Sequence, residues 1–170
     1  PYAGDAKIVI TTDAAVGDKL TVLIDSPADA KNVWIDLNNN GVCDPGEHYE
    51  YIQYRSKSFT ISSKEPIAIH GEISYLDISN NKLTKLDLTA ASKALTALYA
   101  HHNQITELDL AGMSNLNMLS LDSNQLTQLD VSSNEKLFML YATDNALESV
   151  TLPSGTSALI NRVYLYNNRL

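Results

Sequence analysis

One asparagine recurs five times along the chain, each time in the same frame of apolar residues. Around each copy the sequence reads L-x-x-L-x-L-x-x-N-x-L, with Ile, Val or Ala in place of some leucines. The copies are spaced 22, 21, 21 and 23 residues apart, at Asn81, Asn103, Asn124, Asn145 and Asn168. A period of this length is typical of a solenoid, in which each unit is one coil that packs on the next. The repeat therefore predicts a curved stack of coils from Ile73 to Leu170, with parallel strands on a concave face.

A second short apolar segment follows each of the first four asparagines. These segments are residues 86–88, 108–110, 129–131 and 150–152. Each alternates apolar and polar residues, which indicates a strand, and residues 73–170 lack the 3.6-residue periodicity of a helix. We therefore predict short strands on the convex side as well. The asparagines are predicted to face inward and to bond loop backbone of their own and the neighbouring coil, because an unpaired buried amide costs about 1–3 kcal/mol.

The first 70 residues follow a different rule. Short runs alternate with period two and are separated by turns rich in Gly, Asp, Asn and Pro, which predicts antiparallel strands. The predicted strands are residues 6–12, 19–24, 33–37, 51–54, 58–61 and 67–69. The sequence thus predicts two domains: a small sandwich-like β module over residues 1–70 and a solenoid of about five repeats over residues 71–170. Because 70 residues make a thin core, the module is expected to pack on the first repeat and cap the open end of the solenoid.

Composition excludes several classes of protein. The chain has 170 residues and a net charge of −8, which argues against a nucleic-acid-binding surface of clustered Lys and Arg. No apolar run approaches the roughly 20 residues that span a bilayer. The single cysteine, Cys43, excludes an internal disulfide. The chain also lacks a nucleophile elbow, a phosphate-binding loop and an HExxH motif, so it is predicted not to be an enzyme.

The solvent-facing positions of the five concave strands form the candidate binding surface. In a strand x-L-x-L-x the leucines face the core and the x positions face solvent. Four of these positions hold small residues, Ser79, Ala97, Ser120 and Thr143. The other eleven are the candidate ligand-binding residues, Tyr75, Asp77, Tyr99, His101, Met118, Asp122, Met139, Tyr141, Arg162, Tyr164 and Tyr166. Tyrosine suits recognition because it offers a large apolar face at low entropic cost. The alternative is that the tyrosines only stabilise the sheet, at about 0.2–1 kcal/mol per cross-strand pair.

Two further groups of polar residues have structural interpretations. His101 and His102 are adjacent in the sequence and are expected to face opposite ways, which argues against a shared metal site. Asp87, Asp109 and Asp130 recur on the convex side. These aspartates are expected to accept hydrogen bonds from local backbone or from nearby threonines, with a ladder of bound cations as the alternative.

Residues 36–47 fit the calcium-loop pattern D-x-[DN]-x-[DN]-G-x5-E without a mismatch. The predicted ligands are Asp36, Asn38, Asn40, Val42, Asp44 and Glu47, with Val42 acting through its backbone carbonyl. Affinity should be in the extracellular range of about 10⁻⁴–10⁻³ M, because only three ligands are charged. The alternative is a hairpin with a tight turn at Asn40 and Gly41 whose carboxylates are merely solvated. If calcium binds, its role is structural.

The repeat unit L-x-x-L-x-[LA]-x-x-N-x-L-T-x-L-D-[LV] resembles the leucine-rich repeats of secreted and cell-surface proteins from Gram-negative gut bacteria. It is more distantly similar to the internalins. The resemblance covers residues 67–170. The stretch Trp34-Ile-Asp through Pro45-Gly-Glu47 resembles the loop of extracellular GEVED-type β domains. These resemblances imply export, often as a lipoprotein, and a recognition or adhesion role. Any signal or lipid anchor is expected upstream of Pro1.

Three functions are therefore compatible with the sequence. The leading one is a non-enzymatic secreted or surface-exposed module that binds a protein partner on its concave face. The second is a carbohydrate-binding module that uses the same tyrosines as stacking platforms. The third is a structural spacer in a longer surface protein.

Overall fold

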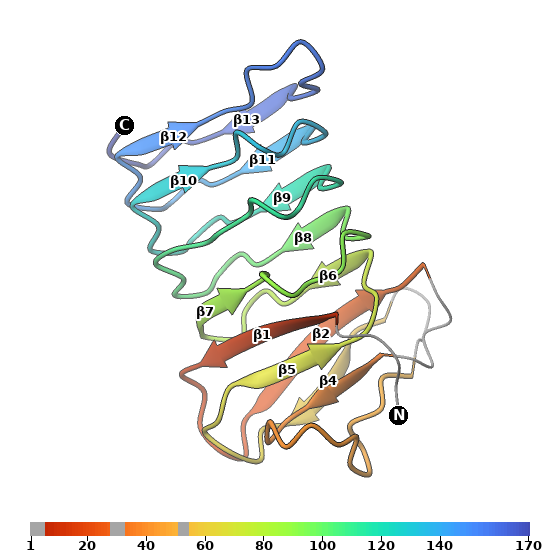
Figure 1. Cartoon of the computed structure of the whole chain (residues 1–170). Coiled ribbons are helices and arrows are strands. Elements are labelled where there is room, and N and C mark those ends of the chain that lie inside the picture. Colours follow the sequence, from red (N-terminus) through yellow and green to blue (C-terminus); the bar gives the residue numbers. More distant parts are fainter. Residues whose placement is uncertain (1–5, 28–32, 51–54) are drawn as a thin grey trace.

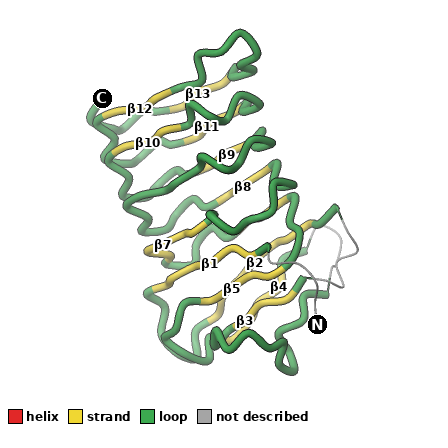
Figure 2. The backbone as a smooth tube through the Cα atoms, viewed as in Figure 1, coloured by secondary structure: helices red, strands yellow, loops and turns green. Residues whose placement is uncertain are grey.

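The computed structural model describes residues 6–27, 33–50 and 55–170, and within them the chain is all β, with no helix (Figures 1 and 2). This confirms the predicted fold class. The thirteen strands are β1 (Lys7–Thr12), β2 (Lys19–Asp25), β3 (Trp34–Asp36), β4 (Lys57–Thr60), β5 (Ile67–His70), β6 (Tyr75–Asp77), β7 (Leu83–Asp87), β8 (Ala97–Tyr99), β9 (Met118–Ser120), β10 (Gln128–Asp130), β11 (Met139–Tyr141), β12 (Ser149–Thr151) and β13 (Arg162–Tyr164). Five of the six strands predicted before residue 70 are present. The sixth, residues 51–54, lies outside the described residues.

One seven-stranded sheet runs the length of the molecule, in the order β13-β11-β9-β8-β6-β2-β4. Strands β6, β8, β9, β11 and β13 pair in parallel, one from each coil, as the repeat predicts. The central leucines of the first four are buried, since Leu76, Leu98, Leu119 and Leu140 are each 0% exposed, and Val163 of β13 is partly buried. We refer to the solvent side of this sheet as the concave face.

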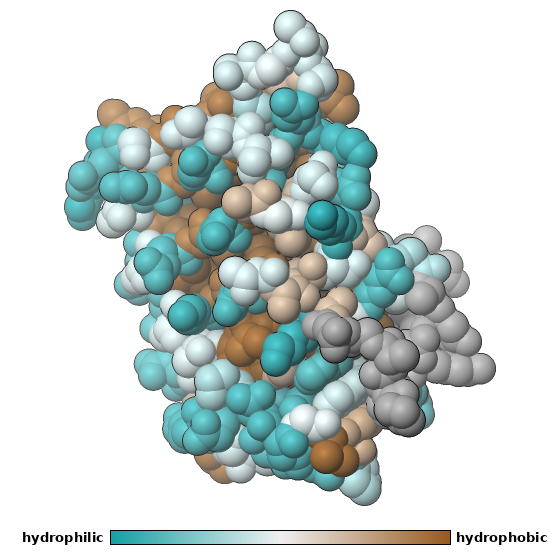
Figure 3. All heavy atoms as spheres, in the orientation of Figure 1, coloured by the Kyte–Doolittle hydropathy of each residue, from teal (hydrophilic) through white to brown (hydrophobic). Residues whose placement is uncertain are grey.

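The opposite side of the stack is less regular. Strand β7 pairs with β1, and β10 pairs in parallel with β12, but residues 108–110 belong to no strand, so the short strand predicted there is wrong. Figure 3 shows this side of the molecule, where polar side chains alternate with apolar seams.

The recurring asparagines form a ladder inside the stack, which confirms their predicted structural role. Asn103 Nδ2 donates to the carbonyls of Ala100 in its own coil (3.0 Å) and Ile78 in the preceding one (3.2 Å). Its Oδ1 accepts from the backbone N–H groups of Asn81 and Leu83, both at 3.0 Å. Asn124, Asn145 and Asn168 repeat this pattern. Each amide therefore ties two coils together.

The N-terminal module continues both sides of the solenoid. Strand β2 pairs antiparallel with β6, and β1 pairs antiparallel with β7 (Figure 1). Asn81 bonds β2 in place of a preceding coil: its Oδ1 accepts from Thr21 N (2.9 Å) and its Nδ2 donates to Thr21 O (2.8 Å). One apolar core runs through both parts, from Ile8 to Leu147. The module thus satisfies the backbone groups that the first coil would otherwise expose.

Candidate functional site

Strand register arranges the concave side chains in rows across the coils. One row contains Tyr75, Ala97, Met118, Met139 and Arg162, and the next contains Asp77, Tyr99, Ser120, Tyr141 and Tyr164. Strand β2 extends these rows with Asp25 opposite Tyr75 and Leu23 opposite Asp77. The structure therefore places all eleven predicted ligand-binding residues in or directly after the five parallel strands of one sheet.

The tyrosines meet in two pairs. The Tyr75 and Tyr99 rings are tilted by 37° with centroids 5.4 Å apart, and the Tyr141 and Tyr164 rings are stacked at 10° and 4.7 Å. Tyr141 Oη also contacts Met139 Sδ at 3.8 Å. Such pairs lend the sheet modest stability, but the rings stay partly open to solvent, and Tyr164 is 36% exposed. Tyr166 follows β13 and is 65% exposed.

The phenols at the N-terminal end of this face are held neutral. The pKa of Tyr75 is raised by partial burial and by the neighbouring Tyr99 and Asp77. The pKa of Tyr99 is raised by partial burial, by Asp77 and by Tyr141. Both rings therefore present hydroxyl donors throughout the physiological pH range.

Two small residues predicted to face solvent are buried instead. Ser120 is 6% exposed because it lies in the row between Tyr99 and Tyr141, whose larger side chains flank it on both sides. Thr143 is 5% exposed, and both its backbone N–H (2.7 Å) and its hydroxyl (2.9 Å) donate to Asp122 Oδ1. One oxygen of Asp122 is therefore occupied in joining two coils.

The histidine pair departs from its prediction. His101 and His102 were expected to face opposite ways, but their Nδ1 atoms lie 2.9 Å apart and their rings meet edge to face. The cause is the left-handed backbone of His102, with φ of 54°, which turns its side chain towards His101. Across the described residues, no group of three or more His, Cys, Asp or Glu side chains is arranged to hold a metal ion.

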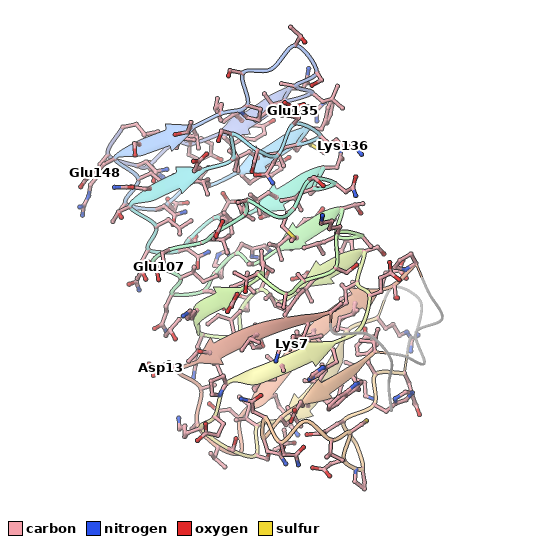
Figure 4. All side chains as sticks on the ribbon, viewed as in Figure 1. Lys7, Asp13, Glu107, Glu135, Lys136 and Glu148 are labelled. Atoms are coloured by element: carbon pink, nitrogen blue, oxygen red, sulfur yellow. The ribbon has the colours of Figure 1, made fainter. Side chains whose placement is uncertain are left out.

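The aspartates of the opposite side cap local turns, which confirms their predicted role. Oδ1 of Asp87, Asp109 and Asp130 each accepts from the backbone N–H two residues later, at 2.9 Å. Hydrogen bonds from Thr89 and Ser132 lower the pKa values of Asp87 and Asp130. Asp87 and Asp109 also line a shallow hollow of about 420 Å³, together with Glu107, which Figure 4 labels on this side of the stack.

The predicted calcium loop is held by its own hydrogen bonds. Asp36 and Glu47 are only 1% and 4% exposed, so the alternative in which they are merely solvated is wrong for these two. Asp36 accepts from the N–H groups of Asn40 (3.0 Å) and Gly41 (2.8 Å). Glu47 accepts from Leu37 N and Asp44 N, both at 2.8 Å. The carboxylates thus bind backbone donors of the turn.

The loop also shows what calcium binding would require. The amide nitrogens of Asn38 and Asn40 both donate to Asp44 Oδ2, at 3.0 and 2.9 Å, so their oxygens point away from that carboxylate. Within the described residues, neither Asp36 nor Glu47 forms an ion pair with Lys or Arg. His70 Nε2 lies 3.8 Å from Asp36 Oδ2, but burial lowers the pKa of this histidine. Calcium takes oxygen ligands of these types, but the amide oxygens of Asn38 and Asn40 already accept hydrogen bonds from Asn40 N (3.1 Å) and Val42 N (2.7 Å).

A hollow of about 320 Å³ lies where β2 meets β6 at one border of the concave face. Its lining includes Thr21, Leu23, Asp77, Ser79, Asn80 and His101. Sequence reasoning missed this hollow because it depends on the pairing of β2 with β6, which no local pattern reveals.

Comparison with known proteins returned no relative: no family model, no curated protein and no solved structure matches the chain. No helix long and apolar enough to cross a membrane occurs in the described ranges.

Proposed function

We propose that this chain is a non-enzymatic recognition module that binds a protein partner on its concave face. The observation that carries the proposal is the set of partly exposed Tyr and Met side chains on the concave face. The sheet beneath them is held by strand pairing and by the asparagine hydrogen bonds inside the stack, so little backbone ordering has to accompany binding. Aromatic residues and Met are enriched at protein interfaces.

The contacts on this face favour a protein over a glycan. A sugar needs an open ring face to stack on, whereas Tyr141 and Tyr164 cover one face of each other. Met118 and Met139 are paired neighbours in the adjacent row, and their flexible thioethers adapt to apolar protein side chains. The likeness of the repeats to leucine-rich repeats supports the same reading. By that resemblance we assign the chain to a secreted or surface-anchored protein.

The experiment is a binding screen against extracellular proteins and glycans, with wild type beside a Tyr99→Ala, Tyr141→Ala, Tyr164→Ala variant. A matched control carries Thr127→Ala and Ser149→Ala, which lie in or beside the β10–β12 sheet. The proposal predicts a protein binder that is lost in the tyrosine variant and kept in the control. A glycan hit with the same dependence would favour the carbohydrate alternative. The absence of any binder for all three proteins would point to a structural spacer, and equal binding of a partner by all three would place the binding surface elsewhere.

We also propose that the loop of residues 36–47 holds a structural calcium ion. Asp36 and Glu47 are buried, and within the described residues neither has a Lys or Arg partner, so a divalent cation would supply the positive charge that the loop lacks. Millimolar calcium should raise the Tm of wild type, and Asp44→Asn should abolish the rise while magnesium has little effect. An unchanged Tm in calcium would show that the loop does not hold a calcium ion.

A further inference from the structure

The hollow between β2 and β6 has the size and position of a side-chain pocket within the proposed binding face. Its volume is about 320 Å³, and Leu23 and Asp77, which face each other across the β2–β6 ladder, both line it. Asp77 also belongs to the row that continues through Tyr99 to Tyr164. A partner lying along that row would therefore pass over the hollow.

The polar groups of the hollow are incompletely paired. Oδ1 of Asp77 accepts from the backbone N–H of Ser79 at 3.0 Å, while Oδ2 accepts no hydrogen bond from the described residues. The hydroxyl of Ser79 is shielded from solvent and has no hydrogen-bond partner among the described residues. Buried polar atoms without partners are rare in folded proteins and call for an explanation. A bound donor group would satisfy Oδ2 of Asp77.

Charge and shape narrow the class of that donor. Asp77 is the only carboxylate among the described lining residues, and no Lys or Arg accompanies it there. Leu23 supplies an apolar wall beside the carboxylate and is partly exposed. Lysine and arginine side chains combine an aliphatic stem with a charged head that donates only, which matches an apolar wall ending at an acceptor. Among the residues that the structure describes, the lining contains no Tyr, Trp or Phe ring that could serve as a platform for a sugar.

The aromatic pair beside Asp77 adds to the attraction for a cation. Tyr99 is the neighbour of Asp77 in the parallel ladder, and its ring meets that of Tyr75. A cation near a tyrosine ring face gains about 0.5–1 kcal/mol at exposed sites. The net charge of −8 also draws a basic segment towards the molecule from a distance.

We propose that this hollow receives one lysine or arginine side chain of the protein partner, with the cation at Asp77 and the stem against Leu23. The inference rests on the proposed function, because it names the residue class that the partner presents at the N-terminal end of the concave face. It makes this end of the face selective for charge, while the tyrosine and methionine rows supply apolar contact.

The test is a titration of ¹⁵N-labelled protein with N-acetyl-lysine methylamide and N-acetyl-arginine methylamide, followed by amide chemical shifts. N-acetyl-norleucine methylamide is the control probe, because it keeps the stem of lysine and lacks the charge. Asp77→Asn tests the site, and Asp25→Asn is its control on the same face, with the same change of charge. Asparagine can still accept from Ser79 N–H, so the fold around residue 77 should be kept.

A cationic probe should shift the amides of Ser79, Asn80 and His101, with affinity about tenfold lower in Asp77→Asn and unchanged in Asp25→Asn. Norleucine should cause no such shifts. Equal shifts with norleucine, or equal affinity for wild type and Asp77→Asn, would overturn the inference. The triple tyrosine variant should still bind the cationic probe, about two- to fivefold more weakly because it lacks the Tyr99 ring. A screen that returns no partner would therefore reject the proposed function, while the probe titration would still decide whether the hollow binds a cation.

Discussion

Residue positions on both faces of the seven-stranded sheet recur with the period of the repeat. The inner positions keep their residue type from coil to coil, whereas the concave positions vary. On the inner side, the asparagine position holds the same residue in all five coils, because its amide must bond two coils at once. On the concave side, one row reads Asp77, Tyr99, Ser120, Tyr141 and Tyr164. The fold tolerates a carboxylate, a small hydroxyl or an aromatic ring at this position. This row of the concave face is therefore where the chain can vary its chemistry at a smaller cost to the stack than at the asparagine position.

The largest effect should come from breaking the inner ladder. Asn124→Leu removes the acceptor of Ile105 N and the donor to Ala100 and Leu121. At about 1–3 kcal/mol for each buried group left unpaired, the loss should exceed about 3 kcal/mol and lower Tm by about 10 °C. Thermal melts followed by circular dichroism provide the measurement. Asn117→Leu is the matched control, since Asn117 is exposed and should change Tm by only a degree or two. Equal melts of the two variants would show that the inner amides do not hold the stack.

Removing the outer rings should have a smaller effect on stability. The Tyr99, Tyr141 and Tyr164 alanine variant breaks both ring pairs, each worth about 0.2–1 kcal/mol. Tm should therefore fall by no more than a few degrees in the same melts. A fall as large as that of Asn124→Leu would mean that the tyrosines are a structural ladder, which is the alternative that the sequence leaves open.

The sequence predicts much of this contrast between constant inner positions and variable concave positions. The leucine and asparagine spacing predicts each coil, because an inward position tolerates few residue types. Three features could not be predicted, because each depends on distant neighbours or on backbone conformation. Ser120 is buried by the tyrosines of adjacent coils, and His102 is turned by a left-handed φ. The hollow at Asp77 exists only because β2 pairs with β6.

Ionisation of the tyrosine hydroxyl groups should have a still smaller effect on stability and also reports on the concave face. Because the pKa values of Tyr75 and Tyr99 are raised above 10.0 in the folded state, their contribution to stability is complete below about pH 10 and is lost as pH rises through the folded values. Absorbance titration at high pH should show two late-ionising tyrosines. Tyr75→Phe and Tyr99→Phe should each remove one. In an otherwise wild-type protein, Asp77→Asn should lower the pKa values of both late-ionising tyrosines. Unchanged pKa values would show that Asp77 does not act on these rings.

The smallest effect is expected at the capped turns of the opposite side. The pKa of Asp130 is lowered by the hydrogen bonds from Ser132, so its contribution to stability is present above the ordinary value of 3.8 and is lost as pH falls through the lowered one. Asp130→Asn should slightly flatten the acid limb of the Tm against pH curve. Identical acid limbs in wild type and variant would show that this cap adds nothing.

The most direct test of the account is the affinity of the partner found in the screen, measured for wild type and for the triple tyrosine variant after their melts have been compared. If the concave face is the binding surface, three interface tyrosines each worth more than about 1 kcal/mol should weaken binding by about 100-fold or more. The Tm should meanwhile stay within a few degrees. Unchanged affinity in a variant that melts like wild type would contradict the account, and the surface of recognition would lie elsewhere.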